Sequence, residues 1–335
     1  MRRKLFTFLV AFLATLSGAV WGDTYNLSSM SGTTNLDGGE HTITGTATEE
    51  VRFTVSGNVT ITLDNANFAW SRNSFGNQCP LELQNGANLT LKILGNNVIE
   101  SKRGVIDERA AGIYVPEGTS LIVDKESTGQ LTVYGRVAIG ANLVADCGNI
   151  DIQGGTIVAV GMKGTGFWTP ASIGGNSIVG SRSGSVTVSN DGVLIAAQAV
   201  NVPDKHFNGG IVFDASTEGK VIGSSVTLKS PLDLNNLHLT VPNGSVLKLG
   251  EGKTITSADN ITVEDGGDIY AYRIEYNIIN LYLIVIFLVV VIYWQSYLLL
   301  FYVDLIHLIH YLIGRHLEIL RRLLALFIKN YMIIG

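Results

Sequence analysis

Short segments in which apolar and polar residues alternate recur along the chain, and several of them begin with asparagine. Asn58-Val-Thr-Ile-Thr-Leu63 has this pattern, and it returns at residues 88–94, 149–152 and 260–263. A period of two predicts β-strands with one buried face. Asparagine suits the turn before a strand, because its side chain caps local backbone groups and tolerates a left-handed conformation. We favour this interpretation over N-glycosylation, which the Asn-x-Thr spelling also matches.

The alternating segments come in pairs joined by a glycine-centred turn. Residues 148–161 and 184–197 are two copies of this unit. One short strand followed by such a pair gives a unit of roughly 25 to 40 residues, which is typical of a structural repeat. Related pairs lie at 121–134, 237–249 and 261–272, and the shorter strands at 111–115, 137–140, 171–174 and 210–213.

Each unit is too small to bury its own apolar face, so we expect successive units to stack and seal a shared interior. Three strands per coil is the arrangement of a single-stranded parallel β-helix, which we predict for residues 51–272. A β-sandwich is the alternative, because two facing sheets show the same alternation. The similarity between copies favours the β-helix. Residues 23–50, rich in Ser, Thr and Gly, are predicted to lead into the stack or cap it.

Three glycine-containing strings between the strand pairs carry a family resemblance. They are Ala-Gly-Ile at 111–113, Ala-Ile-Gly-Ala-Asn at 138–142 and Ser-Ile-Gly-Gly-Asn at 172–176. With the unit at 148–161, they resemble the Gly-Ile-Gly-Gly repeat proteins of bacterial cell surfaces, which are often described as carbohydrate-binding-domain-containing proteins. These proteins are similar to right-handed β-helices of the pectin-lyase-like class. The resemblance covers residues 86–200 well, implies an all-β right-handed β-helix, and carries no catalytic residues to transfer.

The N-terminus has the order of a secretory signal peptide. A basic start at Arg2, Arg3 and Lys4 precedes an apolar run over residues 5–16, and small residues follow. We therefore predict that residues 1–22 direct export and are cleaved after Ala19 or Gly22. A membrane span is less consistent with this run, because crossing a bilayer takes roughly 20 apolar residues.

The composition changes abruptly after Tyr272. Residues 273–335 contain no Thr or Pro and are rich in Ile, Leu, Tyr and Asn, which predicts a hydrophobic helical tail. One interpretation is a membrane anchor, because residues 278–303 are long and apolar enough to span a bilayer. Residues 304–334 then form a second helix with arginines between the leucines. The other interpretation, which we favour, is a reading-frame slip near Tyr272, because A/T-rich DNA read out of frame encodes such residues.

Charge and cysteine content narrow the function classes. The formal net charge is −5 and no basic patch is present, which argues against binding to nucleic acid. Cys79 and Cys147 are the two cysteines. An oxidising compartment permits a disulfide between them, and two buried thiols fit equally well. Neither cysteine has the neighbours of a metal site.

Two groups of aromatic residues are candidate carbohydrate sites, because sugar rings stack on planar side chains and amides bond their hydroxyls. Phe167 and Trp168 lie in an insertion between two repeats, where such folds place function. Trp70 and Phe75, with Asn73 beside them, form the second group. The alternative for either group is that its aromatics cover the core.

The function predicted from these features is that of an exported, cell-surface or extracellular protein that binds glycan or a surface polysaccharide without catalysis, metal or cofactor. The tail offers a membrane contact through residues 278–303. The alternative function is a polysaccharide lyase or hydrolase on the same scaffold, for which the densest charged cluster is Asp107-Glu108-Arg109, just after Lys102 and Arg103. A charged surface loop explains that cluster more simply.

Overall fold

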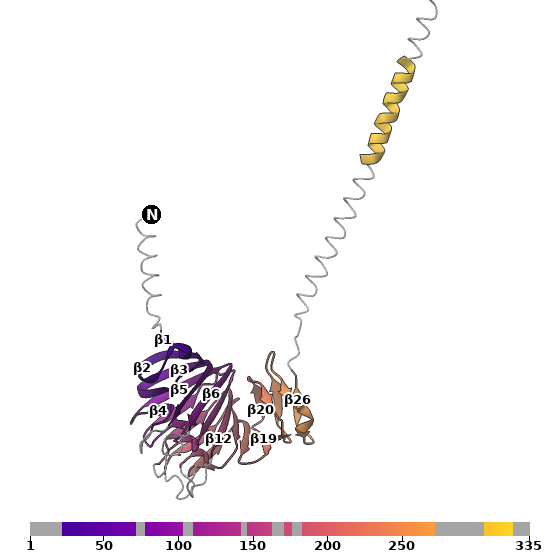
Figure 1. Ribbon diagram of the computed structural model, residues 1–335. Coiled ribbons are helices and arrows are strands. Elements are labelled where there is room, and N and C mark those ends of the chain that lie inside the picture. Colours follow the sequence, from indigo (N-terminus) through magenta and orange to yellow (C-terminus); the bar gives the residue numbers. More distant parts are fainter. Residues whose placement is uncertain are drawn as a thin grey trace, which may run out of the picture. The chain divides into compact units, whose positions relative to one another are not determined.

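The computed structural model describes residues 22–71, 78–102, 110–141, 146–162, 171–175, 183–271 and 305–323. These residues form an all-β body of mostly parallel strands and one helix near the C-terminus (Figure 1). The chain divides into two units, residues 1–272 and 273–335, which are described separately below.

The body consists of two stacks of strands. We call residues 23–214 the first stack and residues 218–270 the second stack. The first stack contains β1 (Asp23–Asn26), β2 (Gly32–Thr46), β3 (Val51–Ser71), β4 (Leu81–Leu83), β5 (Asn88–Leu94), β6 (Asn96–Lys102), β7 (Ile113–Tyr114), β8 (Ser120–Val123), β9 (Gln130–Gly135), β10 (Val137–Gly140), β11 (Asn149–Ile152), β12 (Thr156–Gly161), β13 (Ala171–Gly174), β14 (Ser185–Val188), β15 (Val193–Ala196), β16 (Val200–Asn201), β17 (Asp204–Phe207) and β18 (Gly210–Asp214), with the short 3-10 helix η1 (Leu27–Ser29).

From β4 onward, each coil of the first stack has three strands, and each strand pairs in parallel with the strand three places later in the chain. The two repeat copies at residues 148–161 and 184–197 follow this rule. Ile150 of β11 lies opposite Val186 of β14, and Ile157 of β12 lies opposite Leu194 of β15. These neighbouring copies therefore lie coil upon coil, as predicted. The parallel pairing argues against the β-sandwich, which is built from antiparallel sheets.

The alternation explains how the stack closes its interior. Successive side chains of a strand point to opposite faces, so every second residue faces inward. One inward column runs through β3, β4, β7, β10, β13 and β16, and each of its members is at most 2% exposed. The column consists of Phe53, Leu81, Ile113, Ile139, Ile173 and Val200.

The close approach of neighbouring coils explains why glycine follows isoleucine in the Ile-Gly strings. Gly140 and Gly174 lie opposite each other in register, with φ angles of +141° and +109°. A Cβ on Gly140 would lie 2.1 Å from the carbonyl oxygen of Gly174. Glycine is required here because the coils approach backbone to backbone in a conformation that other residues disfavour.

Asparagines bind successive coils together, which the sequence pattern only partly predicted. The leading asparagines line up on the outside, where Asn88 Nδ2 donates to Asn58 Oδ1 at 2.9 Å and Ser185 Oγ donates to Asn149 Oδ1 at 3.1 Å. Asn97 does the same inside, at 2% exposure. Its Oδ1 accepts from the backbone N–H of Ala66 at 2.8 Å, and its Nδ2 donates to the carbonyl oxygens of Leu94 at 2.9 Å and Gln130 at 3.2 Å.

Residues 23–50 form the first coils of the stack. β2 pairs in parallel with β3, and β1 pairs with the second half of β2. Leu27, Leu36 and Ile43 are buried against the next coils. The segment that the sequence placed before the repeats therefore extends the stack, with Leu36 and Ile43 as the buried residues of β2.

The first stack ends where the chain reverses direction. β18 pairs antiparallel with β19, with Ile211 opposite Val221. The alternation of apolar and polar residues does not predict this reversal. Beyond it, parallel pairing resumes in the second stack, whose elements are β19 (Glu218–Ile222), β20 (Ser225–Leu228), β21 (Leu232–Asp233), β22 (His238–Val241), β23 (Val246–Leu249), β24 (Ile255–Thr256), η2 (Ala258–Asn260), β25 (Ile261–Val263) and β26 (Asp268–Tyr270).

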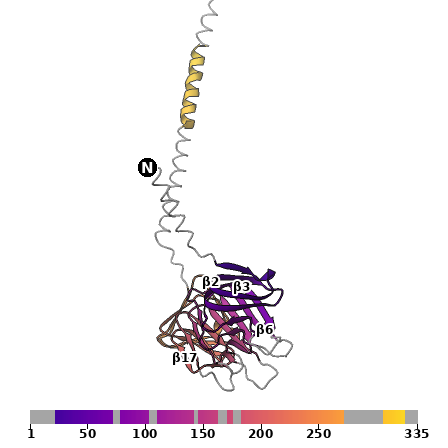
Figure 2. The ribbon, with the colours of Figure 1, turned by 90° about the vertical axis from the view of Figure 1, so that its left-hand side faces the viewer.

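The second stack packs against the first at the start of β12 and at the turn that precedes β15. Thr156 Oγ1 and Ser230 Oγ lie 2.5 Å apart, and the ammonium group of Lys229 lies 3.2 Å from a carboxylate oxygen of Asp191. A turned view shows β2, β3 and β6 of the first stack side by side, as their parallel pairing requires (Figure 2).

In the second unit, residues 305–323 form a helix whose side chains are all exposed. Within the described ranges, none of the helical segments combines the length and apolarity of a membrane span. Residues 278–303, the predicted span, lie outside the described residues, as do residues 1–21 of the predicted signal peptide.

Candidate functional site

A pocket of about 450 Å³ opens on the surface of the first stack, at the corner between its first and second rows of strands. Three successive coils contribute to it through the turn after β4, the turn after β7 and the segment before β11. The residues that line it are Glu82, Leu83, Gln84, Asn85, Tyr114, Pro116, Glu117 and Asp146.

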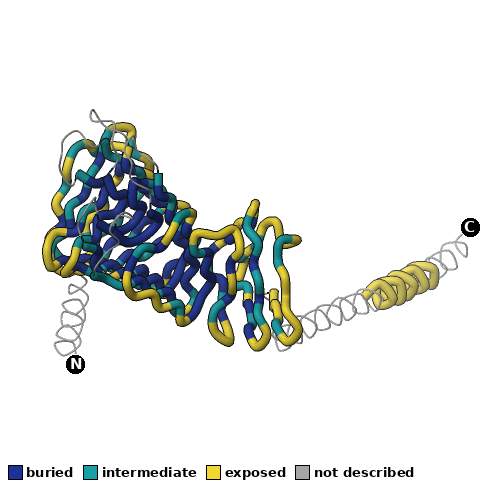
Figure 3. Tube along the Cα trace, turned by 90° about the horizontal axis from the view of Figure 1, so that it is seen from below, coloured by how far each residue is buried: buried dark blue, intermediate teal, exposed yellow. Residues whose placement is uncertain are grey.

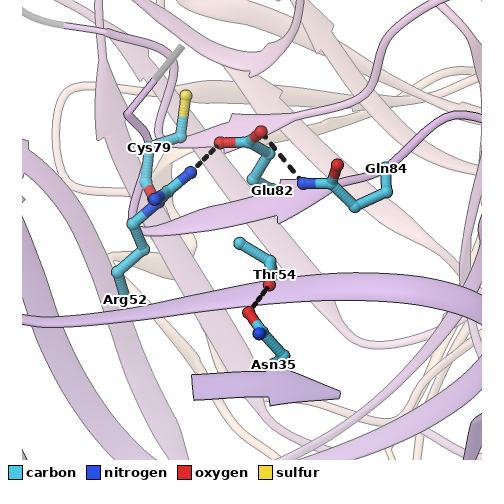
Figure 4. Close-up of polar contacts among 6 residues, drawn as sticks. All are labelled: Asn35, Arg52, Thr54, Cys79, Glu82 and Gln84. Carbon is cyan, nitrogen blue, oxygen red and sulfur yellow. Dashed lines mark hydrogen bonds and ion pairs between the residues drawn. The ribbon is translucent and has the colours of Figure 1, made fainter. Parts of the chain in front are cut away.

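Glu82 is held in place by its strand and by two side chains. In β4, Leu81 and Leu83 point inward and Glu82 points outward, as the alternation requires. One of its carboxylate oxygens pairs with the Arg52 guanidinium, and the other accepts a hydrogen bond from Gln84 Nε2 at 3.1 Å (Figure 4). Arg52 also donates from Nε to the carbonyl oxygen of Cys79 at 3.1 Å. The carboxylate is therefore fixed in orientation on the pocket wall.

Tyr114 lies next to Glu82 across the sheet and opposite Gly140 on its other side. Gly140 places no side chain beside the phenol ring, and Tyr114 is only 8% exposed. Burial raises the pKa of the Tyr114 hydroxyl, and the neighbouring Cys79 and Glu82 raise it further. The hydroxyl therefore keeps its proton at neutral pH and can donate a hydrogen bond.

The two cysteines lie close to this pocket. The structure has Cys79 and Cys147 as buried thiols. Burial raises the pKa of Cys147 to about 12, against a lowering contribution from the backbone of Ala141. A thiol with so high a pKa is a poor nucleophile at neutral pH. Pairing of Cys79 with Cys147 stays a prediction.

The chemistry of the lining suits hydroxyl-rich ligands. The side chains of Gln84 and Asn85 offer both donors and acceptors, and carboxylates accept up to four hydrogen bonds each. Within the part of the chain that the structure describes, no group of three or more His, Cys, Asp or Glu residues has the geometry of a metal site.

Most aromatic and charged residues that the sequence singled out lie outside the described residues: Asn73, Phe75, Arg103, Asp107, Glu108, Arg109, Phe167 and Trp168. Trp70 is described. It lies near the end of β3 opposite Ser101, is partly buried, and does not line the pocket. Its indole N–H is buried and has no hydrogen-bond partner among the described residues.

Sequence reasoning missed the pocket residues, although a signal was present. Gln84-Asn85-Gly86 and Pro116-Glu117-Gly118 occupy the same turn of two successive coils, one before Asn88 and the other before Ser120. Aligning the copies with each other would have shown that their polar turn residues share one corner.

Comparisons with protein-family models, with curated proteins and with solved structures found no match to this chain. The geometry of the pocket and the repeat pattern are therefore the observations that bear on function.

Proposed function

We propose that this chain is an exported, non-catalytic carbohydrate-binding or adhesion module built on a right-handed β-helix of the Gly-Ile-Gly-Gly repeat type. The observation that carries the proposal is the pocket at the corner of three successive coils, where amides, carboxylates and a tyrosine hydroxyl converge. A glycan or surface polysaccharide is the partner.

The stacked scaffold supports binding of an extended polymer. Neighbouring strands lie about 4.8 Å apart, so equivalent turns repeat along the stack at a fixed spacing. Polar turn residues of adjacent coils then meet successive hydroxyl groups of one chain. Concave sites with a few convergent polar groups are the usual form of small-ligand sites.

The charge of the pocket indicates which glycans it accepts. Three carboxylates line it, those of Glu82, Glu117 and Asp146, and the Glu82 carboxylate is paired with the Arg52 guanidinium. A polyuronate chain would bring like charges close to these groups, which is unfavourable. Neutral sugars and amino sugars fit better. The pocket chemistry therefore favours binding over the breakdown of uronate polymers by a lyase.

A glycan array followed by calorimetry tests the proposal. We expect binding to neutral or amino-sugar glycans, weakened at least tenfold by the double variant Gln84→Ala, Asn85→Ala and by Glu117→Ala. The matched control is Glu126→Ala, an exposed acidic turn residue of the same coil that lies away from the pocket, which should bind as the parent does.

Two other results would reject the proposal. Unsaturated or reducing-sugar products that disappear in Asp107→Ala would establish the enzyme. Binding that is lost in Trp168→Ala or Trp70→Ala and kept in the pocket variants would move the site to the aromatic residues.

A further inference from the structure

The helix at residues 305–323 has two sharply different faces. With 3.6 residues per turn, its apolar side chains occupy about half of the circumference. All of them are exposed, for example Leu308 at 53%, Leu317 at 62% and Leu320 at 62%. Within the apolar face only His316 is polar. The face consists of Leu305, Ile306, Leu308, Ile309, Leu312, Ile313, Leu317, Ile319, Leu320 and Leu323.

The opposite face is polar and basic. Arg315, Arg321 and Arg322 lie there, with one acidic residue, Glu318. Arg322 Nε lies 3.2 Å from a carboxylate oxygen of Glu318, and the Arg315 guanidinium lies 5.9 Å from the centre of the Tyr311 ring. The helix is therefore locally cationic, although the whole chain has a formal net charge of −5.

We propose that residues 305–323 bind to the surface of an anionic lipid membrane, with the helix axis in the plane of the interface. A large apolar face beside a cationic polar face is the combination that seats a helix at this depth. The site is distinct from the pocket of the first stack, and the proposal does not depend on glycan binding.

The position of the arginines favours a lipid membrane surface as the partner of this helix. On the helix surface, Arg315 and Arg322 lie at one margin of the apolar face, and Arg321 lies near the other. At an interface, the aliphatic stems of arginines cover apolar surface while the guanidinium groups reach outward. Both margins can then meet lipid phosphates while the leucines enter the acyl region.

Self-association fits the same face less well. A two-stranded coiled coil buries a narrow seam of two positions per heptad, and here the apolar face is about twice as wide. Pairing two copies would also place like-charged arginines along both edges of the contact. An anionic membrane surface can contact both the wide apolar face and the arginines at its margins.

Vesicle flotation of the full chain tests the proposal, with synthesis in a cell-free system in the presence of vesicles. The probes are phosphatidylcholine vesicles with and without about a third of phosphatidylglycerol. We expect a larger fraction of the protein to float with the anionic vesicles than with the neutral ones, and high salt should remove this difference. The triple variant Arg315→Gln, Arg321→Gln, Arg322→Gln should lower partitioning about a hundredfold, because each basic group near an anionic surface contributes about fivefold.

The apolar face has its own variant, Leu308→Gln, Leu312→Gln, Leu320→Gln, which should lower partitioning by a similar factor. The matched control Glu318→Gln removes the negative charge and should bind at least as tightly as the parent. Three results would overturn the proposal: equal flotation with neutral vesicles, flotation unchanged in both triple variants, or a dimer by analytical ultracentrifugation that the leucine variant abolishes while lipid binding is absent.

Discussion

The two stacks are built from the same kind of strand but bury it to different extents. In the first stack, Ile150 and Ile152 of β11 are at most 1% exposed, whereas in the second stack Val263 of β25 is 44% exposed and Ile269 of β26 is 36% exposed. Figure 3 shows the buried segments concentrated in the first stack and the exposed segments at the far end of the second. Alternation alone therefore does not bury a side chain. Neighbouring coils on both sides are needed.

The ends of the two stacks differ as well. In β17, Lys205 occupies the register position that Val59, Leu89, Leu121, Ile150 and Val186 occupy in earlier coils. Its ammonium group pairs with Asp214 at 3.0 Å. This row of strands in the first stack thus ends on a polar strand, as a terminal repeat should. β25 and β26 keep the apolar pattern up to the last described coil.

The largest expected effect is the difference in stability loss between truncating a buried aromatic ring in the first stack and truncating an exposed side chain in the last described coil of the second. Phe53 is fully buried, and its ring centre lies 5.9 Å from that of Tyr25 and 5.4 Å from that of Phe68. Phe53→Ala should lower the free energy of unfolding by about 3–5 kcal/mol. Val263→Ala should lower it by less than about 0.5 kcal/mol. Urea denaturation measures both, and equal losses would show that the end coil is sealed.

Glycine substitutions test how closely the coils approach each other. Gly140→Ala places a Cβ against the Gly174 carbonyl and should cost about 3 kcal/mol or more, because overpacking and an unfavourable φ act together. Gly244 in the second stack has a φ of +75° but nothing within 4 Å of the added Cβ. Gly244→Ala should therefore cost only about 1 kcal/mol. Thermal melts followed by circular dichroism compare them, and a reversed order would contradict the steric explanation.

Asparagine variants test the polar connections between coils. Asn97→Ala removes three hydrogen bonds to the backbone, one of them from the buried N–H of Ala66, and should cost about 2–3 kcal/mol. In the second stack, Asn260 is partly buried and makes one such bond, from Nδ2 to the Leu234 carbonyl oxygen at 2.9 Å. Asn260→Ala should cost about 1 kcal/mol or less. Hydrogen exchange at Ala66 provides a local measurement, since only Asn97→Ala should speed it.

The alternation in the sequence was sufficient to predict an all-β chain, three strands per coil and the stacking of residues 148–161 and 184–197. It could not predict the reversal between β18 and β19, because a period of two is the same for parallel and antiparallel pairing. The turn at 215–217 contains no glycine, and Ala215 adopts a φ of +52° instead. The turn is held by a hydrogen bond from the Glu218 N–H to Ser216 Oγ at 2.9 Å and by one from the Ala215 N–H to the Ala196 carbonyl oxygen at 3.0 Å.

The pocket could not be predicted from the sequence for a related reason. Glu82 and Asp146 are 64 positions apart in the chain, and they meet because three coils keep one register at their corner. A shift of one residue in β4 would turn Glu82 inward. The helical spacing of the tail, by contrast, is local, and the structure confirms a helix at residues 305–323.

The smallest expected effect is a pH dependence of the free energy of unfolding, which arises from groups buried in the first stack. Burial raises the pKa of Cys147 from 9.0 to about 12, so between these values the folded state binds more protons than the unfolded state. Stability is therefore fully present below pH 9 and falls as the pH rises toward 12, by about 1 kcal/mol at pH 10. Tyr114 acts in the same direction, because burial raises its pKa as well.

Urea denaturation at pH 8 and pH 10 measures this dependence. Cys147→Ala should reduce the loss between the two pH values, and Val263→Ala at the exposed end should leave it unchanged. Native Cys147 should also react slowly with a thiol reagent at pH 8 and rapidly after unfolding. A pH dependence that Cys147→Ala does not alter, together with fast native labelling, would mean that the thiol is open to solvent. In that case the first stack would be no better sealed at this corner than the second stack is at its end.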